Sequence, residues 1–227
     1  MNIIVIIPAY NEEAAIGKVI AEIPKSSVRE VVVANNRSTD QTALRAQEAG
    51  ATVVYEPISG YGRACLRAME YVESLDVAPD IIVFLDGDHS DYPEELPKLV
   101  HPITDQGYDM VIGSRALGQR ERGSMTPPQI FGNWLATFLI KHLYNVHYTD
   151  LGPFRAIKWP QLLALNMQDK NYGWTVEMQI KAAKQRLKST EVAVKYRRRI
   201  GVSKVSGTVK GVILAGYKII TTIFKYW

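Results

Sequence analysis

Two aspartates separated by a glycine are the residues of this sequence best suited to chemistry. Asp86 and Asp88 flank Gly87 and directly follow the apolar run 81–85, so they leave a predicted buried strand together. Two unpaired carboxylates repel each other, whereas Mg²⁺ or Mn²⁺ prefers a few carboxylates completed by phosphate oxygens. The alternative is an ordinary turn, in which Asp-Gly is common. In this strand context we expect a divalent cation that bridges Asp86 and Asp88 to a diphosphate.

A cluster of cations near the end of the chain suits the same chemistry. The segment 197–204 holds three consecutive arginines and a lysine around Gly201, and no acid follows Glu191. Arginine and lysine side chains bind phosphate oxygens, so this segment fits a diphosphate or a phosphorylated acceptor. A solvated basic face is the alternative. The cations of the segment are Arg197, Arg198, Arg199 and Lys204.

Three further features carry weaker signals. Residues 60–63 are rich in glycine and open a predicted helix, where Gly62 and Arg63 would lie near a nucleotide phosphate, unless the stretch is an ordinary loop. Asp91 is a further oxygen donor beside the aspartate pair, or else the cap of the next helix. Glu177 begins another predicted helix, either as a functional carboxylate or as an acid that stabilises the helix N-terminus.

These residues need elements that bring them to one place. The first 115 residues alternate short apolar runs with helical patterns, which is typical of βαβ units and a mainly parallel sheet covered on both faces. Ligands of such sheets bind beyond the carboxyl ends of the strands, and polar residues follow four of the strands here. We predict strands at 3–8, 30–34, 52–55, 81–85 and 109–113, and helices at 12–23, 41–49, 62–74 and 94–104.

The second half of the chain has a different pattern. A polar, aperiodic stretch at 116–128 predicts a loop, and loops of that length are usually functional. Apolar residues then recur at helical spacing over 130–146, which predicts an amphipathic helix. Basic and aromatic side chains in the last helix suit the surface of an anionic bilayer, with core packing or a homo-oligomer contact as the alternatives. We also predict a turn-rich segment at 150–155, helices at 159–166, 174–186 and 207–226, and a strand at 191–196.

Composition narrows the class of protein. The chain has 227 residues, 47% of them hydrophobic and 22% charged, which is typical of one large globular domain and excludes disordered and collagen-like chains. Its net charge of +4 and the lack of RNP or KH patterns do not support nucleic-acid binding. Cys65 is the only cysteine, so we expect a reducing, cytoplasmic setting. No segment has the pattern of a signal peptide or a membrane span, so we expect a soluble or peripheral protein.

Taken together, these motifs resemble the family 2 glycosyltransferases of GT-A fold, and among them the dolichyl- or polyprenyl-phosphate sugar transferases. The resemblance spans almost the whole chain. The matching motifs are Ile7-Pro8-Ala9-Tyr10-Asn11-Glu12-Glu13, Ser38-Thr39-Asp40, Asp86-Gly87-Asp88, Gly113-Ser114-Arg115 and Gly201-Val202-Ser203-Lys204. It implies that Pro8, Ala9, Tyr10, Glu12 and Ser38 contact the nucleotide sugar, and that Ser203 joins Arg198, Arg199 and Lys204 at its phosphates.

The resemblance also implies a reaction. A sugar would move with inversion from a nucleotide diphosphate sugar, while the metal and arginines, Arg115 among them, stabilise the departing diphosphate. A lipid phosphate is already ionised and needs no strong general base, so Asp150 or Glu177 would orient it, or serve as base toward a hydroxyl acceptor. We expect the loop at 116–128 to close over donor and lipid.

One departure from the family concerns the nucleotide. The family usually has Asp after the second strand, where this chain has Asn35, and Arg37 stands in place of a glycine. Guanine presents two neighbouring donors that suit a carboxylate, whereas uracil presents one donor between two acceptors, which an amide can match. We therefore expect a UDP-sugar such as UDP-glucose rather than GDP-mannose, with Asn36 as the alternative contact.

The sequence thus predicts an α/β protein of GT-A fold, with a mainly parallel sheet, helices on both faces and an amphipathic C-terminal helix. We expect a glycosyltransferase domain at 1–206, with a nucleotide-sugar half at 1–115 and an acceptor half at 116–206, and a membrane-surface helix at 207–227. The acceptor would be a polyprenyl or dolichyl phosphate at the cytoplasmic face of the membrane, reached through this helix or a membrane-protein partner. The alternatives are a soluble sugar, polysaccharide or protein acceptor, and a non-catalytic subunit that binds nucleotide sugars.

Overall fold

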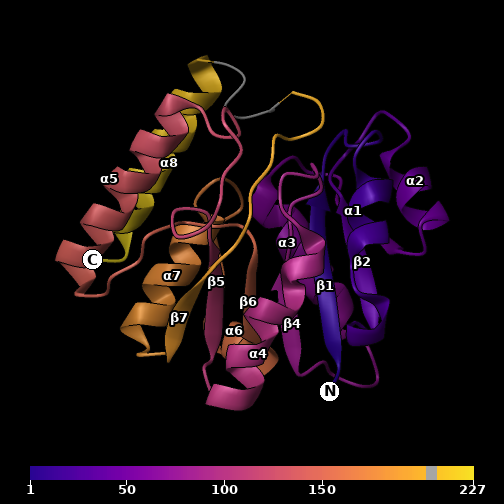
Figure 1. Cartoon of the computed structure of the whole chain (residues 1–227), viewed down its shortest axis with the longest axis horizontal. Coiled ribbons are helices and arrows are strands. Elements are labelled where there is room, and N and C mark those ends of the chain that lie inside the picture. The colour runs from indigo at the N-terminus through magenta and orange to yellow at the C-terminus, as the bar shows by residue number, and fades with distance from the viewer. Residues whose placement is uncertain (203–208) are drawn as a thin grey trace.

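One mixed sheet forms the centre of the molecule. The computed structural model describes residues 1–202 and 209–227, and within them seven strands pair in the order β3-β2-β1-β4-β6-β5-β7 (Figure 1). All neighbouring pairs are parallel except those of β6, which runs antiparallel to both β4 and β5. The strands are β1 (Ile3–Ala9), β2 (Glu30–Asn35), β3 (Thr52–Tyr55), β4 (Ile81–Phe84), β5 (Met110–Ser114), β6 (Arg155–Lys158) and β7 (Ser189–Ala193). The predicted α/β fold with a mainly parallel sheet is confirmed.

Alternating strand residues send their side chains into two layers of helices. In β1, Ile4 and Ile6 pack on one face of the sheet, while Val5 and Ile7 pack on the other. Short 3₁₀ turns at Lys25–Ser27 and Pro93–Glu95 lie in the connections. The first face is covered by α3 (Tyr61–Glu73), α6 (Trp159–Ala164) and α7 (Trp174–Lys184), and the second by α1 (Ile16–Glu22), α2 (Thr42–Glu48) and α4 (Leu96–Gln106).

Two long helices pack beside each other outside these layers. The first, α5 (Pro127–Tyr144), starts after a capping box and ends at Asn145, whose φ of 55° is left-handed. The second, α8 (Val209–Lys225), lies along it (Figure 1), and the Tyr144 hydroxyl donates a hydrogen bond of 2.5 Å to the carbonyl oxygen of Ile223. In the described part of the chain, no helix combines the length and the apolar character needed to cross a bilayer.

The turn-rich segment predicted at 150–155 is wrong at its end, because Arg155 begins strand β6. This strand has four residues with a charge at either end, so its pattern carries no strand signal. Tertiary contacts form it instead. Arg155 is fully buried, and its guanidinium donates to the carbonyl oxygens of Leu151, Gly152 and Thr175. The strand therefore depends on a buried cation that sequence periodicity cannot reveal.

Several predicted boundaries also differ from the structure by a few residues, and the helix predicted at 130–146 is α5, which begins at Pro127 inside the predicted loop. The helix expected at 12–23 begins at Ile16, because Asn11 has a positive φ of 53° and the carbonyl oxygen of Glu12 accepts the first turn's amides. The strand expected at 191–196 is β7, which pairs with β5 only as far as Ala193. Beyond it, Tyr196 forms isolated bridges to two loops.

Candidate functional site

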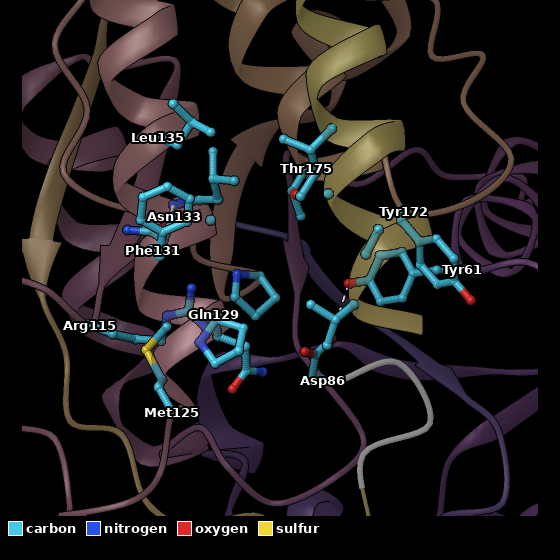
Figure 2. Close-up of a pocket in the computed structure, with 18 of the residues that line it drawn as sticks. Tyr61, Asp86, Arg115, Met125, Gln129, Phe131, Asn133, Leu135, Tyr172 and Thr175 are labelled. Atoms are coloured by element: carbon cyan, nitrogen blue, oxygen red, sulfur yellow. Dashed lines mark hydrogen bonds between the residues drawn. The ribbon is translucent and has the colours of Figure 1, made fainter. Parts of the chain in front are cut away.

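Two adjoining cavities open at the edge of the sheet where β1 and β4 end. The smaller has a volume of about 270 Å³ and the larger about 470 Å³. Figure 2 shows the larger one, with Asp86 and Arg115 at one end and α5 running away from them toward Leu135. Five residues border both cavities: Tyr61, Asp86, Asp88, Tyr172 and Arg199. The aspartate pair therefore stands at the junction of the two spaces.

The two aspartates are held at this junction by different partners. Asp86 accepts a hydrogen bond of 3.0 Å from the Tyr61 hydroxyl, and its burial beside Asp88 raises its pKa to about 6. Asp88 accepts from the backbone amide and the hydroxyl of Ser90 through one oxygen, and its other oxygen lies 2.9 Å from an Arg199 nitrogen. Negative charge is thus concentrated in a buried place, which a divalent cation would stabilise.

A third carboxyl group, that of Asp91, lies close to this pair. Asp91 is 1% exposed, and neither of its carboxylate oxygens has a hydrogen-bond partner among the described residues. Burial and the charges of Asp86 and Asp88 raise the pKa of Asp91 well above its usual value. The alternative prediction that Asp91 caps a helix is wrong, because Tyr92 occupies the cap position of the following 3₁₀ turn. In the described ranges, no three His, Cys, Asp or Glu side chains are grouped as ligands of one metal ion.

Arg115 brings a fixed positive charge to the larger cavity. It follows β5, and its guanidinium donates to both oxygens of Asp150 at 2.8 and 2.6 Å, while its backbone amide donates to Asp150 at 2.7 Å. The ring of Tyr196 lies 5.0 Å from the guanidinium carbon. Asp150 is itself held from behind, because Glu191 accepts the backbone amides of Thr149 and Asp150. Asp150 therefore lies behind Arg115, outside the described lining of either cavity.

Glu177 also lies away from the described walls of both cavities. It is fully buried, and its carboxylate accepts the backbone amides of Gln168 and Asp169. Its carboxylate is also contacted by two side chains. The Lys181 ammonium lies 2.7 Å from it, and the Tyr226 hydroxyl donates a hydrogen bond of 2.6 Å to it. Of the two roles left open by its position at a helix start, the geometry favours a structural one.

Residues that follow β1 and β2 divide between lining the smaller cavity and shaping the loops around it. Asn35 accepts the Ser38 amide, and Ser38 accepts the Asn11 amide, so these two side chains tie the loops together. The Asn36 side chain accepts the Gly60 amide and donates to the carbonyl oxygen of Ile58. The predicted residues that line the smaller cavity are Pro8, Ala9, Tyr10, Glu12, Asn36, Asp86, Gly87, Asp88 and Arg199.

The glycine-rich stretch before α3 has a packing role. A Cβ atom on Gly60 would lie 2.1 Å from the carbonyl oxygen of Lys170, and one on Gly62 would lie 2.0 Å from that of Asp169. Glycine lets the two backbones touch, since any side chain there would collide with main-chain atoms. Gly62 and Arg63, both predicted to contact a nucleotide, stand outside the described lining of the cavities, while Gly60 and Tyr61 belong to it.

The arginines of the predicted cation cluster contact different parts of the molecule. Arg199 reaches the junction, where it faces Asp88 and lies 3.4 Å from a Glu12 oxygen. Arg198 points to the loop before α5, donating to the carbonyl oxygen of Arg122. Arg197 donates to Glu22 and to the carbonyl oxygens of His89 and Asp91. Ser203 and Lys204, also predicted to bind phosphate, lie outside the described residues.

Sequence reasoning missed several residues at the junction. Tyr61 was visible as the residue between two glycines, but nothing marked its hydroxyl as a partner of Asp86. Asn171 and Tyr172 come from the loop before α7 and line the smaller cavity. Tyr196 lines the larger cavity beneath Arg115. Tyr61 begins a helix, and Asn171, Tyr172 and Tyr196 lie in irregular segments, so no periodic pattern marks them and only the folded chain reveals their place.

Comparison with known proteins identifies the relatives of this chain. The family described as Glycosyl transferase family 2 matches residues 4–159. An uncharacterized glycosyltransferase of Mycobacterium tuberculosis is 34% identical over 214 residues, 93% of each chain. A dolichyl-phosphate hexose transferase of Haloferax volcanii is 34% identical over 213 residues, covering 90% of this chain and 86% of the relative.

The solved structures include a similar fold. Glucosyl-3-phosphoglycerate synthase from Mycobacterium tuberculosis, in complex with Mn²⁺, UDP-glucose and phosphoglyceric acid, superposes with a TM-score of 0.76. It is 25% identical in sequence, and the match covers 99% of this chain and 79% of the other. The predicted α/β fold is thus shared with a glycosyltransferase of known structure.

Proposed function

The chain belongs to glycosyl transferase family 2, and from this premise we propose that it transfers a sugar from a UDP-sugar to a polyprenyl phosphate. The observation that carries the proposal is the pair of cavities that meet at Asp86, Asp88 and Arg199. The smaller cavity would hold the nucleotide and the larger the acceptor. The anomeric carbon of the sugar would then lie at the junction, within reach of both.

The aspartate pair suits a divalent cation at the diphosphate. Asp88 is buried and Asp86 is half-buried beside it, and the pKa of Asp86 is raised by loss of solvation and by the charge of Asp88. The similar solved structure contains Mn²⁺ together with UDP-glucose, which supports the same kind of metal for this chain. When bound, Mg²⁺ or Mn²⁺ would stabilise the negative charge that develops on the departing diphosphate. Arg199, beside Asp88, supplies a further positive charge at this point.

The acceptor phosphate would attack the anomeric carbon from the side of the larger cavity. One phosphate oxygen forms the new bond to carbon while the bond to the UDP oxygen breaks, which inverts the configuration at that carbon. The phosphate monoester is ionised at neutral pH, so the step needs no strong general base. Arg115, locked in place by Asp150, is the cation on this side and would orient the phosphate.

The nucleotide preference rests on the amides that follow β2. Asn36 lines the smaller cavity. The side-chain oxygen of Asn35 instead accepts a hydrogen bond from the backbone amide of Ser38. Neither position offers the carboxylate that would bind the two neighbouring donors of guanine. The similar solved structure holds UDP-glucose, which agrees with a uracil nucleotide. We therefore favour UDP-glucose or another UDP-sugar over GDP-mannose.

The apolar walls of the larger cavity favour a lipid-linked acceptor. Beyond Arg115, the cavity is bordered by the first half of α5 and by residues 212–220 of α8, and the side chains that line it there carry no charge. Figure 2 shows Phe131 and Leu135 on α5 along this wall. The opposite wall includes Val212, Ile219 and Ile220 of α8. A polyprenyl chain would be sheltered from water between these helices, with its phosphate at Arg115.

The outer surface of the same helices suits the membrane. On α5, Phe131, Trp134 and Phe138 are 60%, 55% and 43% exposed. The rings of Trp134 and Phe138 are stacked, and the ring of Phe131 is tilted against that of Trp134. On α8, Leu214 and Tyr217 are likewise exposed. Neither helix contains an acidic residue, so the pair is compatible with anionic lipid headgroups. We propose that this face rests on the cytoplasmic leaflet and receives the lipid acceptor from it.

A transfer assay tests the proposal directly. Purified protein with Mn²⁺ and radiolabelled UDP-glucose is given either undecaprenyl phosphate in vesicles or 3-phosphoglycerate in solution. Label in the lipid fraction that is lost in Asp88→Asn supports the proposed reaction. Label in the soluble product would move the acceptor to a small phosphorylated molecule, as in the similar solved structure. No transfer to either, with nucleotide binding intact, would favour a subunit that only binds nucleotide sugars.

A further inference from the structure

The loop at residues 166–173 connects two parts of the molecule that the proposed reaction uses. It precedes α7, and its residues Asn171 and Tyr172 form part of the smaller cavity. Tyr172 also borders the larger cavity (Figure 2). On its other side the loop meets α8.

Two buried carboxylates organise this loop. Asp169 accepts the backbone amides of Asn171 and Gly173 at 2.7 and 3.1 Å, which folds the loop around its side chain. Glu177 accepts the amides of Gln168 and Asp169 from the start of α7. Such bonds between a carboxylate and backbone amides are stronger than neutral ones, so the two acids determine the backbone path of the loop.

Each of these carboxylates also receives a group from the C-terminal helix region. The Lys218 ammonium lies 2.9 Å from the second oxygen of Asp169, whose side chain is 5% exposed. The Tyr226 hydroxyl, just after α8, donates to Glu177 at 2.6 Å. Thr222 of the same helix lies against the loop, because a Cβ on Gly173 would lie 2.5 Å from its hydroxyl oxygen. The loop is therefore clamped from the side of α8.

The other side of the loop presses on the wall of the smaller cavity. The carbonyl oxygen of Lys170 accepts the Arg63 amide, and the backbone at 169–170 touches Gly60 and Gly62 so closely that a Cβ would not fit. Gly60 in turn is held by the side chain of Asn36. A shift of the loop would thus move Asn171 and Tyr172 directly, and the start of α3 through the glycines.

We propose that Asp169 is a positioning residue for nucleotide binding, and that α8, through Lys218, holds the 166–173 loop in the conformation that completes the smaller cavity. This inference rests on the proposed function in one respect, since it takes the nucleotide to occupy that cavity. It also means that α8, which the proposed function places at the membrane, contributes to donor affinity without touching the donor.

The test compares Lys218→Met with Lys218→Arg, which keeps the charge, and with Lys141→Met. Lys141 is an exposed lysine of α5, so its replacement matches the change of charge on the neighbouring helix. Calorimetry measures the Kd for UDP with Mn²⁺, and hydrogen–deuterium exchange follows the peptide containing residues 166–173 in the free proteins. Lys218→Met should weaken UDP binding by at least about fivefold and speed exchange in the loop, while the other two variants stay within about twofold of the parent.

The outcomes separate the two hypotheses. UDP affinity in Lys218→Met equal to that of the parent would overturn the positioning role, as would a loss matched by Lys141→Met. Asp169→Asn, which keeps the size of the side chain, should reproduce the weaker binding, and its circular dichroism spectrum shows whether it is folded. If the parent protein binds no nucleotide, the proposed function fails. The hypothesis that α8 holds the loop is then judged by hydrogen–deuterium exchange alone, and it fails if exchange in the 166–173 loop is the same in Lys218→Met as in the parent.

Discussion

Replacing Asp150 by asparagine tests how the protein fixes the cation of the larger cavity. Asp150 is 1% exposed, and its partner Arg115 is 11% exposed, so neither charge of the pair is well solvated. Asp150 accepts three hydrogen bonds from Arg115, two from the guanidinium and one from the backbone amide. Asparagine keeps the shape and one acceptor oxygen, but it removes the charge.

The magnitude follows from the burial of the charge left behind. An arginine guanidinium keeps its proton in proteins, so Arg115 stays charged when Asp150 is replaced and cannot escape the loss of its partner by deprotonation. Removing one partner of a buried ion pair typically costs about 3–5 kcal/mol. Because asparagine retains one acceptor, we expect a loss of about 3 kcal/mol in the free energy of unfolding.

Urea unfolding followed by circular dichroism measures this loss, with Glu70→Gln as the matched control. Glu70 also pairs with an arginine at 3.0 Å, but the two side chains are 63% and 47% exposed, so its replacement should cost at most about 0.5 kcal/mol. Sugar transfer should fall by about 100-fold in Asp150→Asn, since Arg115 loses its fixed orientation. A loss of stability no greater than that of Glu70→Gln would refute the idea that a buried pair holds Arg115.

Three further predictions concern the metal, the glycine contact and the apolar face. Since the pKa of Asp86 is raised to about 6, the carboxyl takes up a proton as the pH falls through 6, and calorimetry without nucleotide should show Mn²⁺ binding about tenfold weaker at pH 5 than at pH 7. Gly62→Ala places a Cβ 2.0 Å from a backbone oxygen and should lower the free energy of unfolding by about 2 kcal/mol, whereas Gly17→Ala, with open space around it, should raise it by about 0.5 kcal/mol. Replacing both Trp134 and Phe138 by serine should abolish co-sedimentation with anionic vesicles without lowering the melting temperature, and a variant that still binds vesicles would contradict the membrane face.

Much of the fold could be predicted because its strands are apolar and regular. The first five strands were located by short apolar runs such as 3–8 and 81–85, and β1 and β4 are fully buried as those runs require. The aspartate pair was recognisable because it follows such a strand. By contrast, β6 has no apolar pattern, and it begins with Arg155, a residue of a type usually found at the surface but fully buried here. This strand depends on hydrogen bonds from Arg155 to carbonyl oxygens of other segments, and such contacts cannot be predicted from the periodicity of the sequence.

The roles of single acids were harder to predict than their presence. Asp150 and Glu177 were both identified as carboxylates of interest, yet sequence spacing cannot show what a carboxylate faces. In the structure Asp150 is engaged by Arg115, and Glu177 by backbone amides, Lys181 and Tyr226. Arg115 lies 35 residues from Asp150 along the chain, and Tyr226 lies 49 residues from Glu177. Long-range contacts of this kind decide whether an acid serves chemistry or architecture.

The antiparallel strand β6 sets the spacing between the aspartate pair and Arg115. It lies between β4 and β5, so the aspartates that follow β4 and the arginine that follows β5 are two strand spacings apart, or about 10 Å. Because β6 runs in the opposite direction, it starts at the edge where its neighbours end, and Arg155 pairs with both Phe84 and Ile112. The segment that leads into β6 therefore arrives at the same edge and brings Asp150 to Arg115. In a purely parallel sheet, β6 would have ended at this edge, and the acid that pairs with Arg115 would have had to come from another segment.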